Sequence, residues 1–271
     1  MNELQILKSD ITQSREVESE LDVDIPLAAG EILLKVDKFG FSANNVTYAA
    51  AGDQLGYWQF FPASNNETDT WGIIPVWGFA DVVASSAEGV EAGERVFGYY
   101  PTNSYLKMQS VKVFENRLID GAEHRSKLPP GYNTYRRVGK EADYDRDMDN
   151  MRMLLWPLYI TSFCLWDSLQ HNAWHGAKQV IVISASSKTS IGLGYALAAD
   201  TDAPTSIGLT SKRNQEWVAG LGLYDQTKNY DALDEIDASI PTVIVDMSGN
   251  SQLLADIHAH LGDSLVHCLN V

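Results

Sequence analysis

The sequence predicts an α/β protein of two domains, a β-rich barrel over residues 1–150 and a doubly wound parallel sheet over residues 151–271. First, the 271 residues exceed the roughly 100–200 residues of a typical domain. Second, short runs of strand-forming residues in the first half are separated by glycine and proline, which is typical of a small barrel. Third, the second half alternates apolar runs with helical segments, which favours a parallel sheet covered by helices.

Several stretches of the first half have the composition of strands. Residues 31–39 follow Gly30, are rich in strand formers and partly alternate between apolar and charged side chains. We also expect strands at residues 94–100 and 105–114, and a pair of strands within residues 73–85 that is interrupted at Gly78. The glycines and prolines between these stretches indicate the tight turns that a small barrel requires.

The residue composition changes near residue 150, where we place the domain boundary. Residues 140–152 carry a dense mixture of acidic and basic side chains, which we interpret as a solvated linker or the start of a helix. Residues 153–166 then form the longest uncharged apolar run. This run is shorter than the ~20 residues that a bilayer-spanning helix needs and contains Pro157. It therefore predicts a buried helix rather than a membrane span.

The second half alternates strand and helix patterns, as expected for a parallel sheet. Residues 179–183 form a continuous β-branched run, as buried parallel strands do. Apolar patterns predict further strands at residues 205–210, 242–246 and 264–269, within a sheet of about five strands. Helical composition at the intervening positions predicts helices at residues 191–199, 214–221, 231–239 and 252–261.

The balance of acidic and basic side chains indicates which kinds of partner the chain can bind. The chain has 36 acidic and 20 basic side chains, a formal net charge of −16, so a nucleic-acid partner is not expected. The first ten residues contain charges and no apolar segment, so no signal peptide is visible. Two cysteines, Cys164 and Cys268, cannot form a disulfide framework. We expect a cytoplasmic protein with a small-molecule substrate and no membrane partner.

The loop after the first parallel strand is the first candidate binding element. It lies between a buried strand and a helix, where free backbone N–H groups and the helix dipole attract phosphate. A dinucleotide fingerprint places small residues at three positions of such a loop, and serines hold that spacing here. A purely structural turn of small residues would show the same pattern. The candidate cofactor-binding residues of the loop are Ser184, Ser187, Lys188, Thr189 and Ser190.

A phosphate loop of the kinase or ATPase type is a weaker interpretation of the same segment. The order serine, lysine, threonine at residues 187–189 is similar to the end of such a loop. The glycines that this motif requires are absent, since Val182 and Ser187 occupy their positions.

The end of the second parallel strand indicates which dinucleotide would bind. Enzymes that bind NAD usually place an acidic side chain there for the ribose hydroxyl. This chain has Ser211, Lys212 and Arg213 instead, which are groups that a 2′-phosphate would attract. The alternative is that these are ordinary surface cations at a helix start, although cations there oppose the helix dipole.

The whole pattern resembles the medium-chain dehydrogenase/reductase superfamily, in its zinc-independent quinone-oxidoreductase-like branch. Within that branch the chain most resembles bacterial proteins grouped as a domain of unknown function. Residues 31–36 are similar to the family's early strand and residues 41–45 to its following loop. Residues 89–98 resemble its "G-V-x-x-x-G-D-R-V" turn, residues 158–163 its "L-x-x-T-A" helix start, and residues 242–249 its "D-V-V-x-D-x-x-G" strand and turn.

The resemblance implies a GroES-like β-barrel domain followed by a Rossmann-like domain, and it adds Thr161 and Met247 to the expected cofactor-binding residues. The chain is short at its C-terminus compared with the family, so we expect the Rossmann-like sheet to lack its last strand. A strand edge left exposed in this way needs a partner, a cover or a truncated gene to explain it, and a homodimer is one such partner.

The resemblance also implies that no catalytic zinc is bound. Zinc-dependent relatives have a cysteine after the early strand and a histidine–glutamate pair in the next one. Residues 42–44 and 78–80 of this chain contain none of these ligands. The pairs His171/His175 and His258/His260 have no accompanying cluster of glutamate or cysteine, so no metal site is expected.

The activity implied by the resemblance is hydride transfer from NADPH to a quinone, an enone or an enoyl-type substrate. Related reductases use a tyrosine after the early strand, and Tyr57 is the candidate proton donor or carbonyl anchor, with Tyr48 as a rival and Asn45 as a polar cleft residue. Aromatic packing is the alternative role of Tyr57. The missing glycines and the short C-terminus keep two other functions open, a non-catalytic NADP(H)-binding sensor or pseudoenzyme and a protein without a nucleotide site.

Overall fold

The computed structural model describes residues 2–271. The chain divides into two units within one long helix, α2 (Asp149–His171); the first unit ends at Leu154 and the second is Leu155–Val271. The expected domain boundary, between residues 150 and 151, lies just before this division. Among the described residues, no helix is long and apolar enough to cross a membrane.

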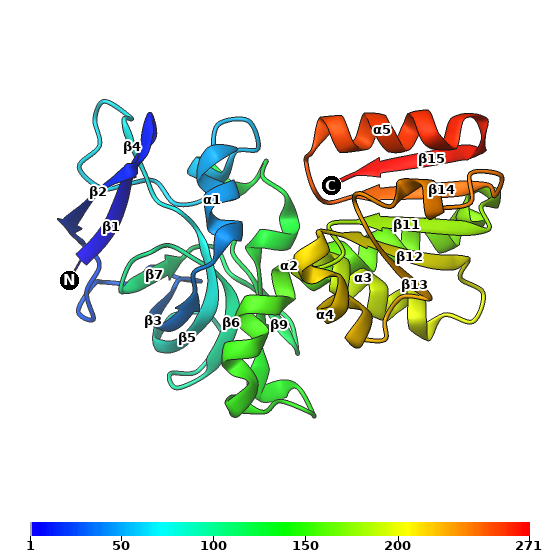
Figure 1. Cartoon of the computed structure of the whole chain (residues 1–271). Helices are drawn as coiled ribbons and strands as arrows, with labels where there is room; N and C mark the ends of the chain where they lie inside the picture. Colours follow the sequence, from blue (N-terminus) through cyan, green and yellow to red (C-terminus); the bar gives the residue numbers. More distant parts are fainter. Residues whose placement is uncertain (1) are drawn as a thin grey trace. The chain divides into compact units, whose positions relative to one another are not determined.

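The first unit contains two antiparallel sheets (Figure 1). The smaller sheet has the order β2-β1-β4, with strands β1 (Asn2–Leu7), β2 (Asp10–Glu18) and β4 (Trp71–Gly72). The larger, curled sheet has the order β7-β3-β5-β6-β10-β9-β8. Its strands are β3 (Ile32–Gly40), β5 (Val76–Ser85), β6 (Arg95–Tyr100), β7 (Tyr105–Met108), β8 (Lys112–Val113), β9 (Arg117–Ile119) and β10 (Thr134–Arg137).

Helical segments of the first unit connect these strands. Helix α1 (Ala43–Ala50) follows β3, and single 3₁₀ turns follow at intervals along the chain. The 3₁₀ turns are η1 (Tyr57–Gln59), η2 (Glu123–Arg125), η3 (Pro130–Asn133), η4 (Val138–Lys140) and η5 (Arg146–Met148).

Gly78 does not interrupt a strand, contrary to the sequence-based expectation, because β5 runs unbroken from Val76 to Ser85. The glycine is instead required by the close approach of β3. A Cβ at Gly78 would lie 2.4 Å from the carbonyl oxygen of Lys38, where β3 also contains a register shift. The missing side chain lets the two strands curl against each other, so a glycine inside a strand marks close backbone contact here.

The charged stretch before α2 is held by ion pairs rather than freely solvated. The carboxylate of Asp149, with no exposed side-chain area, accepts from the Arg95 guanidinium at 2.8 Å. Glu141 binds Arg152 and Arg136, each at 2.6 Å. These contacts fix the start of α2 on the first unit.

The second unit is a five-stranded parallel sheet of order β13-β12-β11-β14-β15. Its strands are β11 (Gln179–Ile183), β12 (Thr205–Thr210), β13 (Gln226–Asn229), β14 (Thr242–Asp246) and β15 (Leu265–Asn270). The helices are α3 (Lys188–Ala199), α4 (Gln215–Gly220) and α5 (Ser251–Leu261), with 3₁₀ turns η6 (Ala173–Gly176), η7 (Lys212–Asn214), η8 (Leu233–Glu235) and η9 (Gly262–Ser264).

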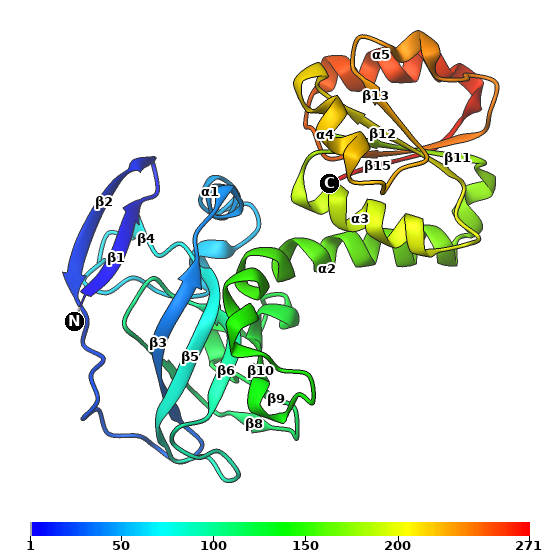
Figure 2. The ribbon, with the colours of Figure 1, turned by 60° about the horizontal axis from the view of Figure 1, so that its bottom comes forward.

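Helices cover both faces of this sheet, and Figure 2 shows α3 and α5 on opposite sides of it. Successive residues of a strand point to opposite faces, and β11 is buried along its whole length. Val180 and Val182 belong to a core cluster with Leu193 of α3. Ile181 and Ile183 belong to a second cluster with Ile257 of α5. The continuous apolar run of β11 follows from this burial on both faces.

One sequence-based prediction for this unit is wrong, and one strand was missed. The helix expected at residues 231–239 is only the short turn η8. The strand β13 was not predicted, because its residues Gln226–Asn229 are polar and carry no apolar run. It is a strand because it pairs in parallel register with β12 at the edge of the sheet.

Candidate functional site

The loop after β11 is a sharp turn that leads directly into α3. Ser184 has a φ of 62°, a left-handed conformation that is rare for a residue other than glycine. The Ala185 N–H donates to the Leu209 carbonyl at 3.0 Å, which holds the turn against β12. Ser187 caps α3, since its Oγ accepts from the Ser190 N–H at 3.1 Å. The remaining amides of the first helical turn have no intrahelical acceptor and are free for an anion.

The buried side of this loop is fixed by hydroxyl groups and a thioether. Ser190 is fully buried; its Oγ accepts from the Ser187 hydroxyl at 2.8 Å and donates to Sδ of Met247 at 3.1 Å. The Tyr224 hydroxyl donates to the Ser190 carbonyl at 2.7 Å. Ser190 and Met247 therefore support the loop on its buried side. Lys188 is exposed and Thr189 is half-buried in the first turn of α3.

Helix α2 also supports the loop. The Ser162 hydroxyl donates to the carbonyl of Thr189 at 2.7 Å, and a Cβ at Gly192 would lie 2.6 Å from Ser162 Oγ. Thr161, the residue expected from the resemblance, is half-buried at the neighbouring position of α2. Close packing of α2 on the start of α3 therefore depends on Gly192.

The segment after β12 lies beside the loop. Ser186 Oγ accepts from Nδ2 of Asn214 at 3.0 Å, which joins the two segments. Lys212 and Arg213 are exposed and form no ion pair with any carboxylate of residues 2–271. Ser211 Oγ is buried and has no hydrogen-bond partner in the described part of the chain. Two unpaired cations and an orphaned buried hydroxyl are a donor set that suits a phosphate group.

The acidic side chain at the end of β14 is engaged in its own turn. Asp246, at the end of β14, is buried and accepts from the Ser248 N–H at 2.8 Å and the Ser248 hydroxyl at 2.6 Å. Strand β12 ends in Thr210, so no carboxylate occupies the position that would bind a ribose hydroxyl in an NAD site.

The first unit contains the other candidate residues, within an aromatic cluster. Tyr57 begins η1, directly after Gly56 with φ of 76°, and is half-buried. Its hydroxyl lies 3.2 Å from the hydroxyl of Tyr132, and the two rings meet edge to face. Burial raises the pKa of Tyr132, so this hydroxyl stays protonated and can donate to the oxygen of Tyr57. That arrangement leaves the Tyr57 proton free for another acceptor.

Tyr48, the rival of Tyr57, is enclosed. Its hydroxyl accepts from Asn44 Nδ2 at 2.8 Å and from Trp77 Nε1 at 3.1 Å, and its ring is packed 4.6 Å from that of Tyr57. Burial raises the pKa of Tyr48 to about 12. Since only 4% of Tyr48 is exposed, Tyr57 is the better placed of the two to meet a ligand.

The side-chain amide of Asn45 is used within the fold. Its Oδ1 accepts from the Ser42 N–H at 2.8 Å as part of a capping box on α1, and its Nδ2 donates to the Pro75 carbonyl at 3.0 Å. A role of Asn45 as a polar cleft residue stays a prediction. Among residues 2–271 there is no group of three or more histidine, cysteine or acidic side chains that could hold a metal ion.

Several residues that shape these sites were not anticipated from the sequence. Their contacts join positions far apart in the chain, up to 75 residues for Tyr57 and Tyr132. The sequence holds a signal only for Tyr224, because two glycines of α3 and β12, Gly194 and Gly208, leave room for its ring. The residues missed in this way are Tyr132, Ser162, Ser186, Asn214 and Tyr224.

Comparison with known proteins places the chain in a family. Residues 39–271 match the family described as Protein of unknown function (DUF2855). No curated protein sequence matches the chain.

Solved structures with the same fold include reductases and dehydrogenases. The CurK enoyl reductase is 15% identical, with a TM-score of 0.57 over 96% of this chain and 70% of that one. CurA from Vibrio vulnificus, solved in complex with NADPH, is 12% identical, with a TM-score of 0.58 over 95% of this chain and 66% of that one. Galactitol-1-phosphate dehydrogenase from Escherichia coli is 13% identical, with a TM-score of 0.54 over 96% and 72% of the two chains.

At these identities the similarity establishes the fold. A GroES-like antiparallel half-barrel and a five-stranded Rossmann-like sheet match the folds of medium-chain dehydrogenase/reductase enzymes, so the predicted fold class is confirmed. The expected quinone-oxidoreductase branch stays a prediction.

Proposed function

The chain belongs to the DUF2855 family, and from the site geometry we propose that it is an NADPH-dependent, zinc-independent oxidoreductase. In this proposal it transfers hydride to a quinone, an enone or an enoyl-type substrate. Support comes from the fold shared with an enoyl reductase and a dehydrogenase, and with CurA, which was solved with NADPH.

The observation that carries the proposal is the cationic segment after β12. Lys212 and Arg213 have no carboxylate partner among residues 2–271, and the buried Ser211 hydroxyl has no hydrogen-bond partner. In a protein of net charge −16, unpaired adjacent cations beside a helix N-terminus favour a bound phosphate. Since β12 ends without an acidic residue, the segment suits the 2′-phosphate of NADPH better than the ribose hydroxyl of NADH.

The residues of the chain have distinct tasks in this reaction. The first amides of α3 and Lys188 bind the pyrophosphate, and Ser190 with Met247 holds the loop in shape. When bound, the nicotinamide group supplies the hydride. Tyr57 donates a proton to the substrate oxygen or polarises its carbonyl, while Tyr132 holds the Tyr57 hydroxyl in place.

Isothermal titration with NADPH and NADH tests the cofactor assignment. We expect NADPH to bind at least tenfold more tightly, since each hydrogen bond to a charged group contributes about 1.5–3 kcal/mol. The double variant Lys212→Ala/Arg213→Ala should lose this preference. Lys228→Ala is the matched control, because Lys228 is a cation of the same unit that is already paired with Glu235 at 2.6 Å. Equal affinity for the two dinucleotides, or binding of neither, would refute the assignment.

A non-catalytic NADP(H) sensor is the second candidate. It is favoured by the serines of the loop, because Ser184 takes a left-handed conformation where glycine is usual, and Ser187 and Ser190 bond each other. NADPH binding without oxidation of NADPH on any member of a panel of quinones and enones would support the sensor. Turnover on that panel would exclude it.

A further inference from the structure

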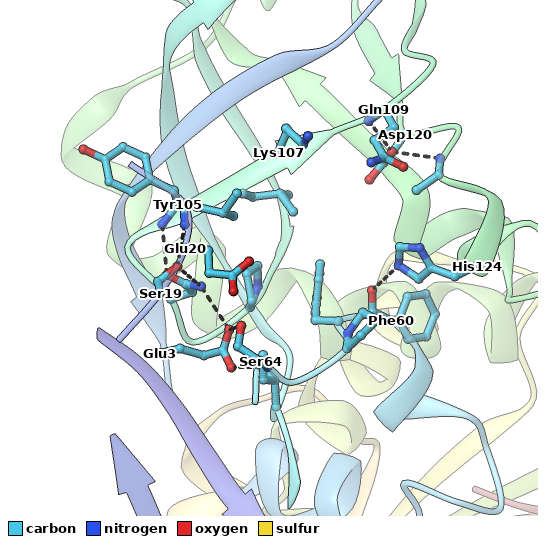
Figure 3. A pocket seen from close by; sticks show the side chains of 18 of the residues that line it. Glu3, Ser19, Glu20, Phe60, Ser64, Tyr105, Lys107, Gln109, Asp120 and His124 are labelled. Carbon is cyan, nitrogen blue, oxygen red and sulfur yellow. Dashed lines mark hydrogen bonds between the residues drawn. The ribbon is translucent and has the colours of Figure 1, made fainter. Parts of the chain in front are cut away.

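The pocket of the first unit is satisfied by its own side chains. It has a volume of about 250 Å³ and lies beside Glu3, Ser19, Ser64 and His124 (Figure 3). Glu3 accepts from the Ser64 N–H at 2.8 Å and from Asn103 Nδ2 at 3.3 Å. The same amide donates to Ser19 Oγ at 3.1 Å. Since these groups bond one another, they need no ligand to complete them.

A groove on the second unit has a different character. It lies between α2 and α3, which run side by side (Figure 2), and has a volume of about 500 Å³, within the roughly 300–1,000 Å³ of small-molecule sites. On α3 the small side chains of Ala196 and Ala199 leave room beside Tyr195. The lining residues of α2 recur at helical spacing and share one face: Tyr159, Phe163, Trp166 and Gln170.

Three aromatic side chains of this groove are exposed. Tyr195 is 65% exposed, Phe163 47% and Tyr159 45%. Contrary to the sequence-based expectation of a buried helix over residues 153–166, this face of α2 is therefore open. Large apolar side chains that gather in one hollow without cover are a feature of binding surfaces.

The charge of the groove is negative. Among the described residues that line it, Asp200 is the only charged side chain. Asp200 forms no ion pair within residues 2–271. It is also the residue that caps the C-terminal end of α3, where the last carbonyls carry the negative end of the helix dipole. Both features favour a cationic ligand over an anionic one.

The hydrogen bonds of Asp200 indicate which kind of cation fits. Its Oδ2 accepts from Trp166 Nε1 at 2.9 Å and from Gln170 Nε2 at 3.3 Å, and its Oδ1 accepts from the Asp202 N–H at 2.9 Å. These neutral donors occupy most of the roughly four acceptor positions of a carboxylate but leave its charge uncompensated. A primary ammonium group would therefore find few acceptors for its N–H groups, whereas a cation without N–H groups needs none.

We propose that this groove binds the quaternary ammonium group of a small organic cation. Such a group carries its charge on methyl groups, which the rings of Tyr159, Phe163 and Tyr195 contact through cation–π interactions. Asp200 and the end of α3 supply the negative potential without a direct hydrogen bond. Binding there requires neither NADPH nor turnover, so its test is independent of the proposed oxidoreductase activity.

NMR titration of the full chain with choline at neutral pH tests this proposal. We expect choline to bind and to shift the indole N–H resonance of Trp166, which lines the groove. Two analogues of similar size are the controls. The neutral carbon analogue, in which a tert-butyl group replaces the trimethylammonium group, lacks the charge, and ethanolamine presents N–H donors instead of methyl groups. Each should bind at least about threefold more weakly, as loss of a cation–π contact predicts.

Two matched pairs of variants separate the contributions. Tyr195→Leu keeps an apolar side chain but removes the ring, so it should weaken choline binding about two- to fivefold, whereas Tyr195→Phe should retain it. Asp200→Asn removes the charge and should also weaken binding. Asp202→Asn is its control, because this exposed acid does not line the groove.

Thermal melting shows whether Asp200→Asn folds; if it does not, the two exposed Tyr195 variants carry the test alone. No binding of choline, equal binding of the carbon analogue or of ethanolamine, or equal affinity in Tyr195→Leu and Tyr195→Phe would each overturn the proposal.

Discussion

The hydroxyl pair of Tyr57 and Tyr132 allows a sharp test of catalysis in the first unit. The variants Tyr57→Phe and Tyr132→Phe each remove one side of the same 3.2 Å hydrogen bond. A neutral hydrogen bond of this kind contributes about 1 kcal/mol to stability, so both variants should lose stability by a similar amount. If Tyr57 donates the proton, only Tyr57→Phe also removes a general acid, which is worth about 10²–10⁴-fold in rate.

The assay is the rate of NADPH oxidation on an enone, together with the thermal melting temperature of each variant. We expect Tyr57→Phe to lower kcat by at least about 100-fold, and Tyr132→Phe to lower it by tenfold or less, because the second variant only loosens the donor. Equal losses in both variants would assign the pair a structural role. Unchanged turnover in Tyr57→Phe would remove Tyr57 from the mechanism.

Three other changes have defined outcomes. Ser211→Ala should leave the free energy of unfolding unchanged or raised, since its buried hydroxyl has no hydrogen-bond partner among the residues that the structure describes, while weakening NADPH binding in calorimetry about tenfold. Gly208→Ala should cost about 1–3 kcal/mol in urea unfolding, because its Cβ would lie 2.6 Å from Cδ2 of Tyr224, whereas Gly220→Ala, with open space around it, should not destabilise. Burial alone would raise the pKa of Glu141, but its hydrogen bonds to arginine side chains outweigh burial and lower the pKa. Glu141→Gln should therefore lower the free energy of unfolding relative to the wild type by its whole amount above pH 4.5. This difference should vanish as the pH falls below the lowered pKa.

Apolar periodicity predicted the strands that are strongly buried. It failed where strand pairing or tertiary packing determines the secondary structure. Strands β11 and β14 are buried on both faces, so their sequences are continuous apolar runs. Strand β13 is polar and exists through pairing with β12, which no local pattern records. Residues 231–239 have a helical composition, yet only Leu233–Glu235 form a turn, because composition alone does not supply the packing that stabilises a helix.

In the candidate sites, too, local sequence patterns could be recognised and long-range contacts could not. The serine loop could be located because a buried strand, a turn and a helix follow one another within about twenty residues, and this order itself favours phosphate binding. Tyr132 and Asn214 could not be found, because their contacts with Tyr57 and Ser186 depend on how distant segments pack. The groove between α2 and α3 was also missed, since its lining residues lie on two helices that only the fold brings together.

Transfer of deuterium from NADPH labelled at the nicotinamide C4 tests the central claim most directly. The chain is incubated with the labelled cofactor and a panel of enones and enoyl thioesters, on which hydride goes to carbon and does not exchange with water. The account predicts deuterium in the reduced product, detected by mass spectrometry, and none when Lys212→Ala/Arg213→Ala is assayed at a limiting NADPH concentration. Binding of NADPH without deuterium in any product would contradict the oxidoreductase assignment.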